Sequence, residues 1–390
     1  LWVGFAVAAV VLRGPVWEEN YEFAQVFLDD IAYPEAHPLY LHTKNLFTLQ
    51  LYLTAAQVWL GGDPAWVCGV RNVLYLIAKT LPFFLLGAWA GKRVLVGHVA
   101  ALAAFLAAGE GFTRAYPTLA WSMFAGNGVV GSGAALAALV CLVCGRYGIG
   151  FALAAALPAI HLGQCPPLGL FCAILFFHVL LRGTGAERLR MFAGIAVGGS
   201  VTVLSLVVWW WSRVDYAPAP PYTSELSPEI IWQRWLSNLG GHQVFGVGID
   251  QLAMVWSLWL LLACLLAAPR GSLARTTYGW LLLYCSLLCG IVWVCMALHA
   301  YLGERTPHLL LGWMPYRLPN HLPPLMATLV VLRVFAVAQA RLARAGLLLI
   351  LVLPFIGVQA QTTLIVLTAF ALLLAWWASA WNAWRSAPCV

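Results

Sequence analysis

The chain has 390 residues, of which 63% are hydrophobic and only 9% are charged. Soluble domains carry about a quarter charged residues, so the composition excludes that class. The formal net charge of +7 comes from basic residues scattered singly between apolar runs. This scatter is typical of membrane topology and argues against a nucleic-acid-binding surface.

Apolar runs near the bilayer-spanning length of about 20 residues recur along the whole chain. They predict an all-α, polytopic integral membrane protein with about 12 transmembrane helices, forming a single membrane domain over residues 1–390. The run before Arg13 is short, and no cleavage-site pattern follows it, so we interpret it as a truncated first transmembrane helix rather than a signal peptide. The predicted spans are 1–13, 72–90, 95–109, 129–144, 148–161, 167–182, 191–211, 250–268, 277–298, 323–338, 345–358 and 363–381.

The apolar run 46–60 is short for a span, and the loop charges decide how it is interpreted. If it crossed the membrane, Lys92 and Arg93 would share a side with the acidic loop 18–35. If it lies along the surface, the short basic loops share one side, and every acidic residue except Glu187 faces the other. Basic loops are retained in the cytoplasm. We therefore expect 46–60 to be an interfacial helix, both termini to be cytoplasmic, and the membrane to be the bacterial cytoplasmic membrane.

Three outer-face segments, 14–71, 212–249 and 299–322, are long enough to hold a site. The first contains a predicted amphipathic surface helix that opens at Pro15, and 228–245 is expected to form another surface helix. In the first helix an apolar stripe and an acidic stripe follow helical spacing. The apolar stripe is Trp17, Tyr21, Ala24, Leu28 and Ile31, and the acidic stripe is Glu18, Glu22, Gln25 and Asp29.

The most informative stretch runs from RGPVWEENYEFAQVFLDD, which begins at Arg13, through HPLYL at His37, to WLGGDPAWVCGVRNVLYLIAK, which ends at Lys79. In this order come a first transmembrane helix, an acidic pair, a surface helix, a His-Pro-Leu-Tyr, a Gly-Gly turn and an Arg that opens the second span. The order resembles the N-terminal third of GT-C class membrane glycosyltransferases, which use polyprenyl-phosphate-linked sugars. Beyond residue 95 the resemblance is only architectural.

The resemblance implies transfer of a hexose or pentose from a polyprenyl-phosphate donor to an acceptor on the extracytoplasmic face. Such a reaction needs a carboxylate as general base, and Glu18 and Glu19 are the candidates, where the family usually has Asp. Glu18 shares the acidic stripe with Glu22, so we expect Glu19 to be the base and Glu18 to orient the acceptor or a divalent metal such as Mg²⁺ or Mn²⁺. No other cofactor is implied. The alternative is that these acids only favour the first turn of a helix.

Cations near the acidic pair are candidates for binding the donor phosphate. His37 and His42 flank Pro38, and Lys44 follows them; they contact phosphate or simply sit at the interface. Glu110 lies in the second outer loop, where the family tends to place a further acid. Arg114 follows it, and the alternative for these two is a loop-tip ion pair.

A second group of candidates lies in the late outer segment GERTPHLLLGWMPYRLPNHLPPLM, just before the predicted span at 323–338. Here Tyr316, Arg317 and His321 are expected to line a lipid-phosphate site, with Arg317 as the main contact because a guanidinium holds two phosphate oxygens. The alternative is snorkelling to anionic lipid headgroups.

Isolated polar residues inside or beside spans complete the set. Lys79 lies within the second span, which makes it a functional candidate, or it pairs with a carbonyl or a nearby acid. His161 is expected to be a structural residue at a helix end. Cys141 and Cys144 form a CxxC inside an apolar run, and we expect packing rather than metal or redox chemistry.

Two functions remain in contention. The leading prediction is a GT-C-like glycosyltransferase, with membrane lipids and the polyprenyl-phosphate sugar donor as partners. The alternative is a non-catalytic subunit of a larger membrane complex with a glycosyltransferase-like fold, whose partners are other protein subunits. Nucleic acid is not an expected partner. No Walker loop, dinucleotide fingerprint or HExxH site is present in the sequence, and related halves typical of a secondary transporter are not apparent.

Overall fold

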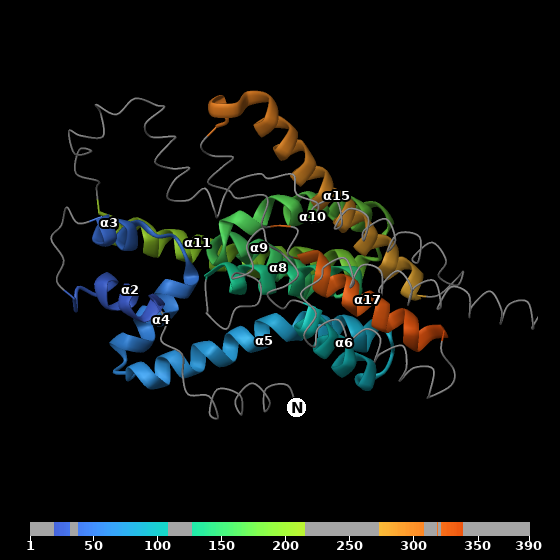
Figure 1. Ribbon diagram of the computed structural model, residues 1–390, viewed down its shortest axis with the longest axis horizontal. Coiled ribbons are helices and arrows are strands. Elements are labelled where there is room, and N and C mark those ends of the chain that lie inside the picture. Colours follow the sequence, from blue (N-terminus) through green and yellow to red (C-terminus); the bar gives the residue numbers. More distant parts are fainter. Residues whose placement is uncertain are drawn as a thin grey trace, which may run out of the picture.

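The computed structural model describes residues 19–31, 38–107, 127–214, 273–307, 318 and 321–337. Within these ranges the regular secondary structure is helical, with no strand (Figure 1). The elements are α2 Glu19–Phe27, α3 Pro38–Asn45, α4 Leu49–Trp59, α5 Pro64–Ala90, α6 Val94–Ala107, α8 Asn127–Val143, α9 Tyr147–Ile160, η1 Leu162–Gln164, α10 Cys165–Arg182, α11 Gly185–Ser212, α15 Leu273–Leu302, η2 Gly303–Arg305 and α17 Leu322–Val337.

Several of these helices are long and apolar enough to cross a membrane. Among the described residues the segments that meet both criteria are Pro64–Ala90, Leu162–Arg182, Gly185–Ser212 and Thr277–His299. Shorter apolar helices pack between them at 94–104, 128–143 and 147–160. The chain is therefore an α-helical, multi-pass membrane protein.

Each predicted span that falls within the described ranges coincides with a helix, namely α5, α6, α8, α9, α10, α11, α15 and α17. The remaining predicted spans, 1–13, 250–268, 345–358 and 363–381, lie outside the described residues, as does the surface helix expected at 228–245. The helix expected at 46–60 is α4, whose 11 residues extend about 16 Å, short of a hydrocarbon core about 30 Å thick. It is too short to span.

Two spans begin earlier than the hydropathy pattern predicts. Helix α5 begins at Pro64 rather than near 72, because the side chain of Asp63 accepts a hydrogen bond from the backbone N–H of Trp66 and caps the helix. Helix α11 begins at Gly185 rather than near 191, because Thr184 and Glu187 form a capping box. The polar residues that follow both caps lie inside the helices.

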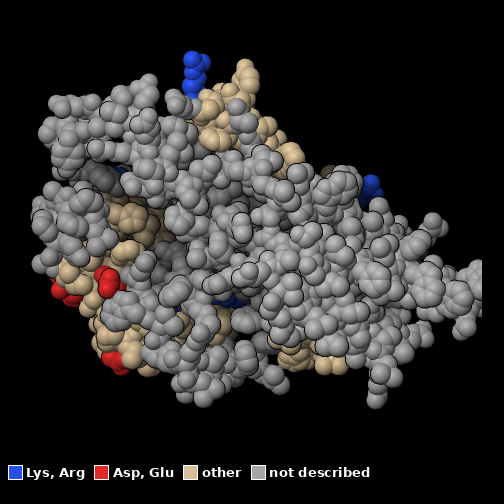
Figure 2. Space-filling model, viewed as in Figure 1, with Lys and Arg blue, Asp and Glu red and all other residues tan. Residues whose placement is uncertain are grey.

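Helices α2, α3 and α4 cover one end of the bundle, together with the first turns of α5 (Figure 1). We call this the acidic end. The hydroxyl of Thr48 donates to the carbonyl of Ile160 at 3.2 Å, and the indole N–H of Trp209 donates to the carbonyl of Asn45 at 2.9 Å. The last residues of α9 and α11 therefore meet the connection between α3 and α4. Figure 2 shows the acidic side chains gathered over this part of the molecule.

Basic turns lie at the opposite end of the bundle, which we call the basic end. Helix α5 ends at Ala90, just before Lys92, and the guanidinium of Arg146 stacks over the ring of Trp89 at 5.6 Å. Gly148 lies against the backbone of Arg190. The charge asymmetry used to predict the topology is thus also present in three dimensions.

The interior of the bundle is aliphatic and closely packed. One cluster of buried residues joins α5, α6, α8, α9, α10, α15 and α17, and it includes Phe171, Leu175 and Tyr284. Helices α9 and α11 approach most closely at Gly194 and Gly198, where a Cβ would overlap backbone carbonyls of α9. This is the small-residue contact that lets two apolar helices pack in a membrane.

Candidate functional site

Helix α2 has the amphipathic character expected from its sequence. Tyr21 and Ala24 are buried, whereas Glu22 and Asp29 are exposed. The apolar stripe contacts protein: Tyr21 packs against Val67 and Cys68 of α5, and Ala24 packs against Leu51 and Ala55 of α4. We expected the helix to lie on the membrane. Its described apolar face is covered by α4 and α5 instead.

The acidic pair stands at the start of this helix. Glu19 is the first residue of α2, and Glu18 lies outside the described residues. Because Tyr21 packs against Val67 and Cys68, the first turn of α2 sits over the first turns of α5. The backbone of the predicted base is therefore close to the point where α5 enters the bundle.

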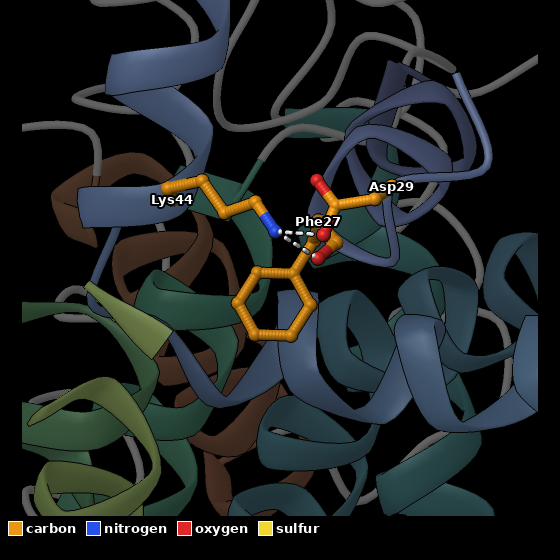
Figure 3. A network of polar contacts seen from close by, with 3 residues as sticks. All are labelled: Phe27, Asp29 and Lys44. Carbon is orange, nitrogen blue, oxygen red and sulfur yellow. Dashed lines mark hydrogen bonds and ion pairs between the residues drawn. The ribbon is translucent and has the colours of Figure 1, made fainter. Parts of the chain in front are cut away.

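Lys44 fastens the end of α2 to α3 (Figure 3). Its Nζ donates to the carbonyl of Phe27 at 2.8 Å and to Oδ2 of Asp29 at 2.7 Å. The ammonium also lies over the rings of Phe27 and Tyr40, 5.6 and 5.4 Å from their centroids. Asp29 adopts a φ of 64°, which turns its carboxylate back toward this cation. In this structure the phosphate candidate Lys44 holds two surface helices together.

The two histidines considered with Lys44 have different fates. His42 is exposed on α3, with its ring edge-on to Phe23 at a centroid distance of 6.3 Å. His37 lies outside the described residues, as do Glu110, Arg114, Tyr316 and Arg317. The predicted contacts of these last five stay predictions.

A buried guanidinium lies directly beneath α2 and α4. Arg71, one turn further along α5 than Val67, is only 6% exposed. Its Nη1 donates to the backbone carbonyl of Gln50 at 3.1 Å and to the hydroxyl of Thr54, and its Nη2 donates to the hydroxyl of Tyr75 at 2.8 Å. These described partners are uncharged, so they orient the cation without neutralising it.

The same face of α5 carries further buried polar side chains towards the basic end. Tyr75 and Lys79 follow Arg71 at intervals of four residues, which places all three on one face of the helix. Asn72 and Thr80 are buried beside them. Polar residues inside a membrane-spanning helix are costly and tend to be functional. The Arg-x-x-x-Tyr-x-x-x-Lys spacing was the sequence signal for this stripe, and only its two ends were noticed.

The turn between α9 and α10 meets the α4 side of this stripe. The carbonyl of Ile160 accepts from Thr48 at 3.2 Å and from Nε2 of Gln50 at 3.4 Å. His161 caps the end of α9, in the structural position expected for it, and its side chain packs against Gly131 of α8. Gln164 ends the turn and is buried; its Nε2 donates to Oγ of Ser132 at 3.2 Å.

His321, from the late outer segment, lies in the core. It is 1% exposed, and its Nδ1 is 3.0 Å from the hydroxyl of Tyr284 on α15. Tyr284 in turn packs edge-on against Phe171 of α10. Among the described residues, His321 therefore contacts a tyrosine inside the bundle rather than the surface.

The cysteines of the described residues are free thiols. Cys141 is buried in α8, and Cys144 follows the end of that helix. Within the described ranges, no three His, Cys, Asp or Glu side chains are grouped closely enough to hold a metal ion.

No protein-family model, curated protein or solved structure matches this chain. Its function therefore has to be argued from the residues. The acidic end combines carboxylates at the surface with a buried, oriented guanidinium about one helical turn below them. That pairing suits a reaction in which one group accepts a proton while another stabilises a departing anion.

Proposed function

We propose that this protein is a GT-C-like glycosyltransferase that moves a sugar from a polyprenyl-phosphate donor to an acceptor at the acidic end. The observation that carries the proposal is Arg71, a buried guanidinium held by three uncharged groups beneath the acidic start of α2. A fixed cation at the rim of a membrane domain suits a phosphate whose lipid tail remains in the bilayer.

The reaction assigns one role to each side of this arrangement. The carboxylate of Glu19 takes the proton of the acceptor hydroxyl as that oxygen attacks the anomeric carbon of the sugar. The bond between the anomeric carbon and the phosphate oxygen breaks, and polyprenyl phosphate leaves with the electron pair. Glu18 orients the acceptor. The charge of Arg71 stabilises the phosphate as its negative charge grows, and burial strengthens this effect because the surroundings are less polarisable than water.

The basic end is then the cytoplasmic end. Lys92, Arg146 and Arg190 lie there, as the retention of basic loops in the cytoplasm requires. The acidic end faces the extracytoplasmic side of a bacterial cytoplasmic membrane, where polyprenyl-linked donors and outer-face acceptors meet.

Sugar transfer in proteoliposomes tests the proposal. The assay follows loss of a radiolabelled hexose from undecaprenyl phosphate, with a cell-envelope extract as the source of acceptors. Glu19→Gln keeps the shape and removes the base, so the rate should fall by about 10²- to 10⁴-fold. Full transfer by the Glu18→Gln, Glu19→Gln double variant would refute the mechanism.

A matched pair of variants separates the charge of Arg71 from the packing around it. Arg71→Met removes the cation and should weaken binding of undecaprenyl phosphate by about 10- to 100-fold, the equivalent of one charge-assisted hydrogen bond. Tyr75→Phe removes one of the groups that orient Arg71 but leaves the charge, so its affinity should stay within about threefold of the wild type. Equal affinities for wild type and Arg71→Met would remove Arg71 from the donor site.

One observation favours the alternative of a non-catalytic subunit. Helix α11 exposes a row of small side chains, Ala193, Ala196 and Ser200, on the side opposite its contact with α9. Such a row is typical of faces that pack against another helix in the membrane. If wild-type protein neither binds nor consumes the donor, and bulky substitutions on this row dissociate a co-purifying membrane subunit, this alternative is preferred.

A further inference from the structure

The turn between α9 and α10 contains a buried amide that the proposed reaction does not yet use. Gln164 is 6% exposed, and Nε2 donates to Oγ of Ser132 at 3.2 Å. Its Oε1 is fully buried and has no hydrogen-bond partner among the described residues. Turning the amide over would satisfy the oxygen through the Ser132 hydroxyl and leave an N–H without a partner instead. In either orientation one polar atom of this side chain is unsatisfied.

An unsatisfied buried amide atom is unfavourable, so native proteins pair such atoms with protein groups, water or a ligand. The backbone around Gln164 is firmly held, which argues against rearrangement of the turn as the remedy. Two side chains of the α4 segment, Thr48 and Gln50, donate to the carbonyl of Ile160 at its start. The backbone N–H of Gln164 donates to the carbonyl of His161 at 3.1 Å, and α8 approaches closely at Gly131.

Hydrogen bonds connect this turn to the proposed phosphate site. Arg71 donates to the backbone carbonyl of Gln50, and the side chain of Gln50 donates to the carbonyl of Ile160, four residues before Gln164. Gln164 and Ser132 are thus the next buried polar side chains along the hydrogen-bonded path that leads inward from Arg71. The sugar of the donor is covalently attached to the phosphate, so its hydroxyls would lie in the same direction.

We infer that Gln164, supported by Ser132, binds a hydroxyl group of the sugar carried by the polyprenyl-phosphate donor. A primary amide suits this role, because a sugar hydroxyl is both a donor and an acceptor and can satisfy whichever amide atom faces it. Sites built to hydrogen-bond a hydroxyl discriminate strongly against ligands that lack one. Gln164 would therefore distinguish a sugar-bearing carrier from the bare carrier. The inference rests on the proposed function.

The test measures binding of two probes to the full chain in nanodiscs, undecaprenyl phosphate and undecaprenyl-phosphate-linked glucose. Gln164→Met keeps the length of the side chain and removes the amide. It should weaken binding of the glucose-bearing lipid by about 3- to 10-fold, the usual range for one neutral hydrogen bond, and leave binding of undecaprenyl phosphate unchanged. Thr328→Val is the matched control, because Thr328 is equally buried but donates to the carbonyl of Pro324 within α17. It should change neither affinity.

Each further outcome is decisive. Equal affinities for wild type and Gln164→Met, or an equal loss for both probes, overturns the inference and leaves the proposed transferase standing. If wild-type protein binds neither probe, the proposed function fails and the inference fails with it. If Gln164→Met does not fold, Ser132→Ala decides: it releases the amide from its only described partner and should weaken binding of the glucose-bearing lipid alone by about twofold. No selective change in that variant overturns the inference.

Discussion

The packing of α11 against α9 offers a sharp test of the fold, because two adjacent glycines of α11 have opposite surroundings. A Cβ built on Gly198 would overlap the carbonyl oxygen of Ala152 and lie 2.9 Å from the Cβ of Ala155. A Cβ built on Gly199 meets no described heavy atom within 4 Å. Gly198→Ala should therefore push two helices apart, whereas Gly199→Ala adds a methyl group to an open face.

The size of the effect follows from what obstructs the new methyl group. The obstacle at Gly198 is backbone, which cannot rotate away, so the whole helix must shift. Gly194, one turn earlier, loses its fit against α9 in the same shift. Overpacking of this kind costs about 1–3 kcal/mol. Gly199→Ala should instead gain up to about 1 kcal/mol from helix propensity. We expect the two variants to differ by about 2–4 kcal/mol in free energy of unfolding.

Unfolding in mixed micelles measures this difference. Each variant is titrated with sodium dodecyl sulfate while helicity is followed by far-ultraviolet circular dichroism. The Gly198→Ala midpoint should move to a lower mole fraction of the denaturing detergent, and that of Gly199→Ala should stay or rise. If the two midpoints coincide, or if Gly198→Ala is the more stable variant, the close α9–α11 contact described here is wrong.

Three further predictions concern the acidic end, the basic end and their sidedness. Single cysteines replacing Asp30 and Arg188 in a cysteine-free background should react with an impermeant maleimide from opposite sides of the membrane; labelling from the same side contradicts the topology. Lys44→Met should loosen α2 by about 1 kcal/mol, since its partner Asp29 is largely exposed, and hydrogen exchange of α2 should rise about fivefold while the bundle is unaffected. Lys92 has a φ of 54°, so Lys92→Gly should raise stability by about 1 kcal/mol in thermal unfolding, and no gain there would count against the left-handed turn.

The membrane-spanning helices in the described ranges could be predicted because length and apolarity are local properties. Helices α8, α9 and α10 begin and end within a few residues of the predicted 129–144, 148–161 and 167–182. Their boundaries are marked by Gly, Pro and charged residues in the sequence itself.

Helix starts were less well predicted where polar residues follow a cap. The cap signals were present as Asp63 before Pro64 and as Thr184 three residues before Glu187. Hydropathy alone excluded the polar turns that follow, including Arg71 at the predicted boundary. Those residues are helical because tertiary contacts and caps satisfy them. Helix α3 was not predicted at all, and in the structure Lys44 anchors it to α2.

The acidic pair was found from the sequence, because a family-like order of motifs marks Glu18 and Glu19. The groups that surround the proposed donor site were not. Whether Arg71 is solvated or buried depends on a carbonyl 21 residues away, and Gln164 meets its partner Ser132 across 32 residues. The free energy of a buried polar group depends on which distant groups complete its hydrogen bonds. The sequence by itself thus determined that the chain is helical and crosses the membrane, and only the tertiary structure decided which polar residues face one another inside it.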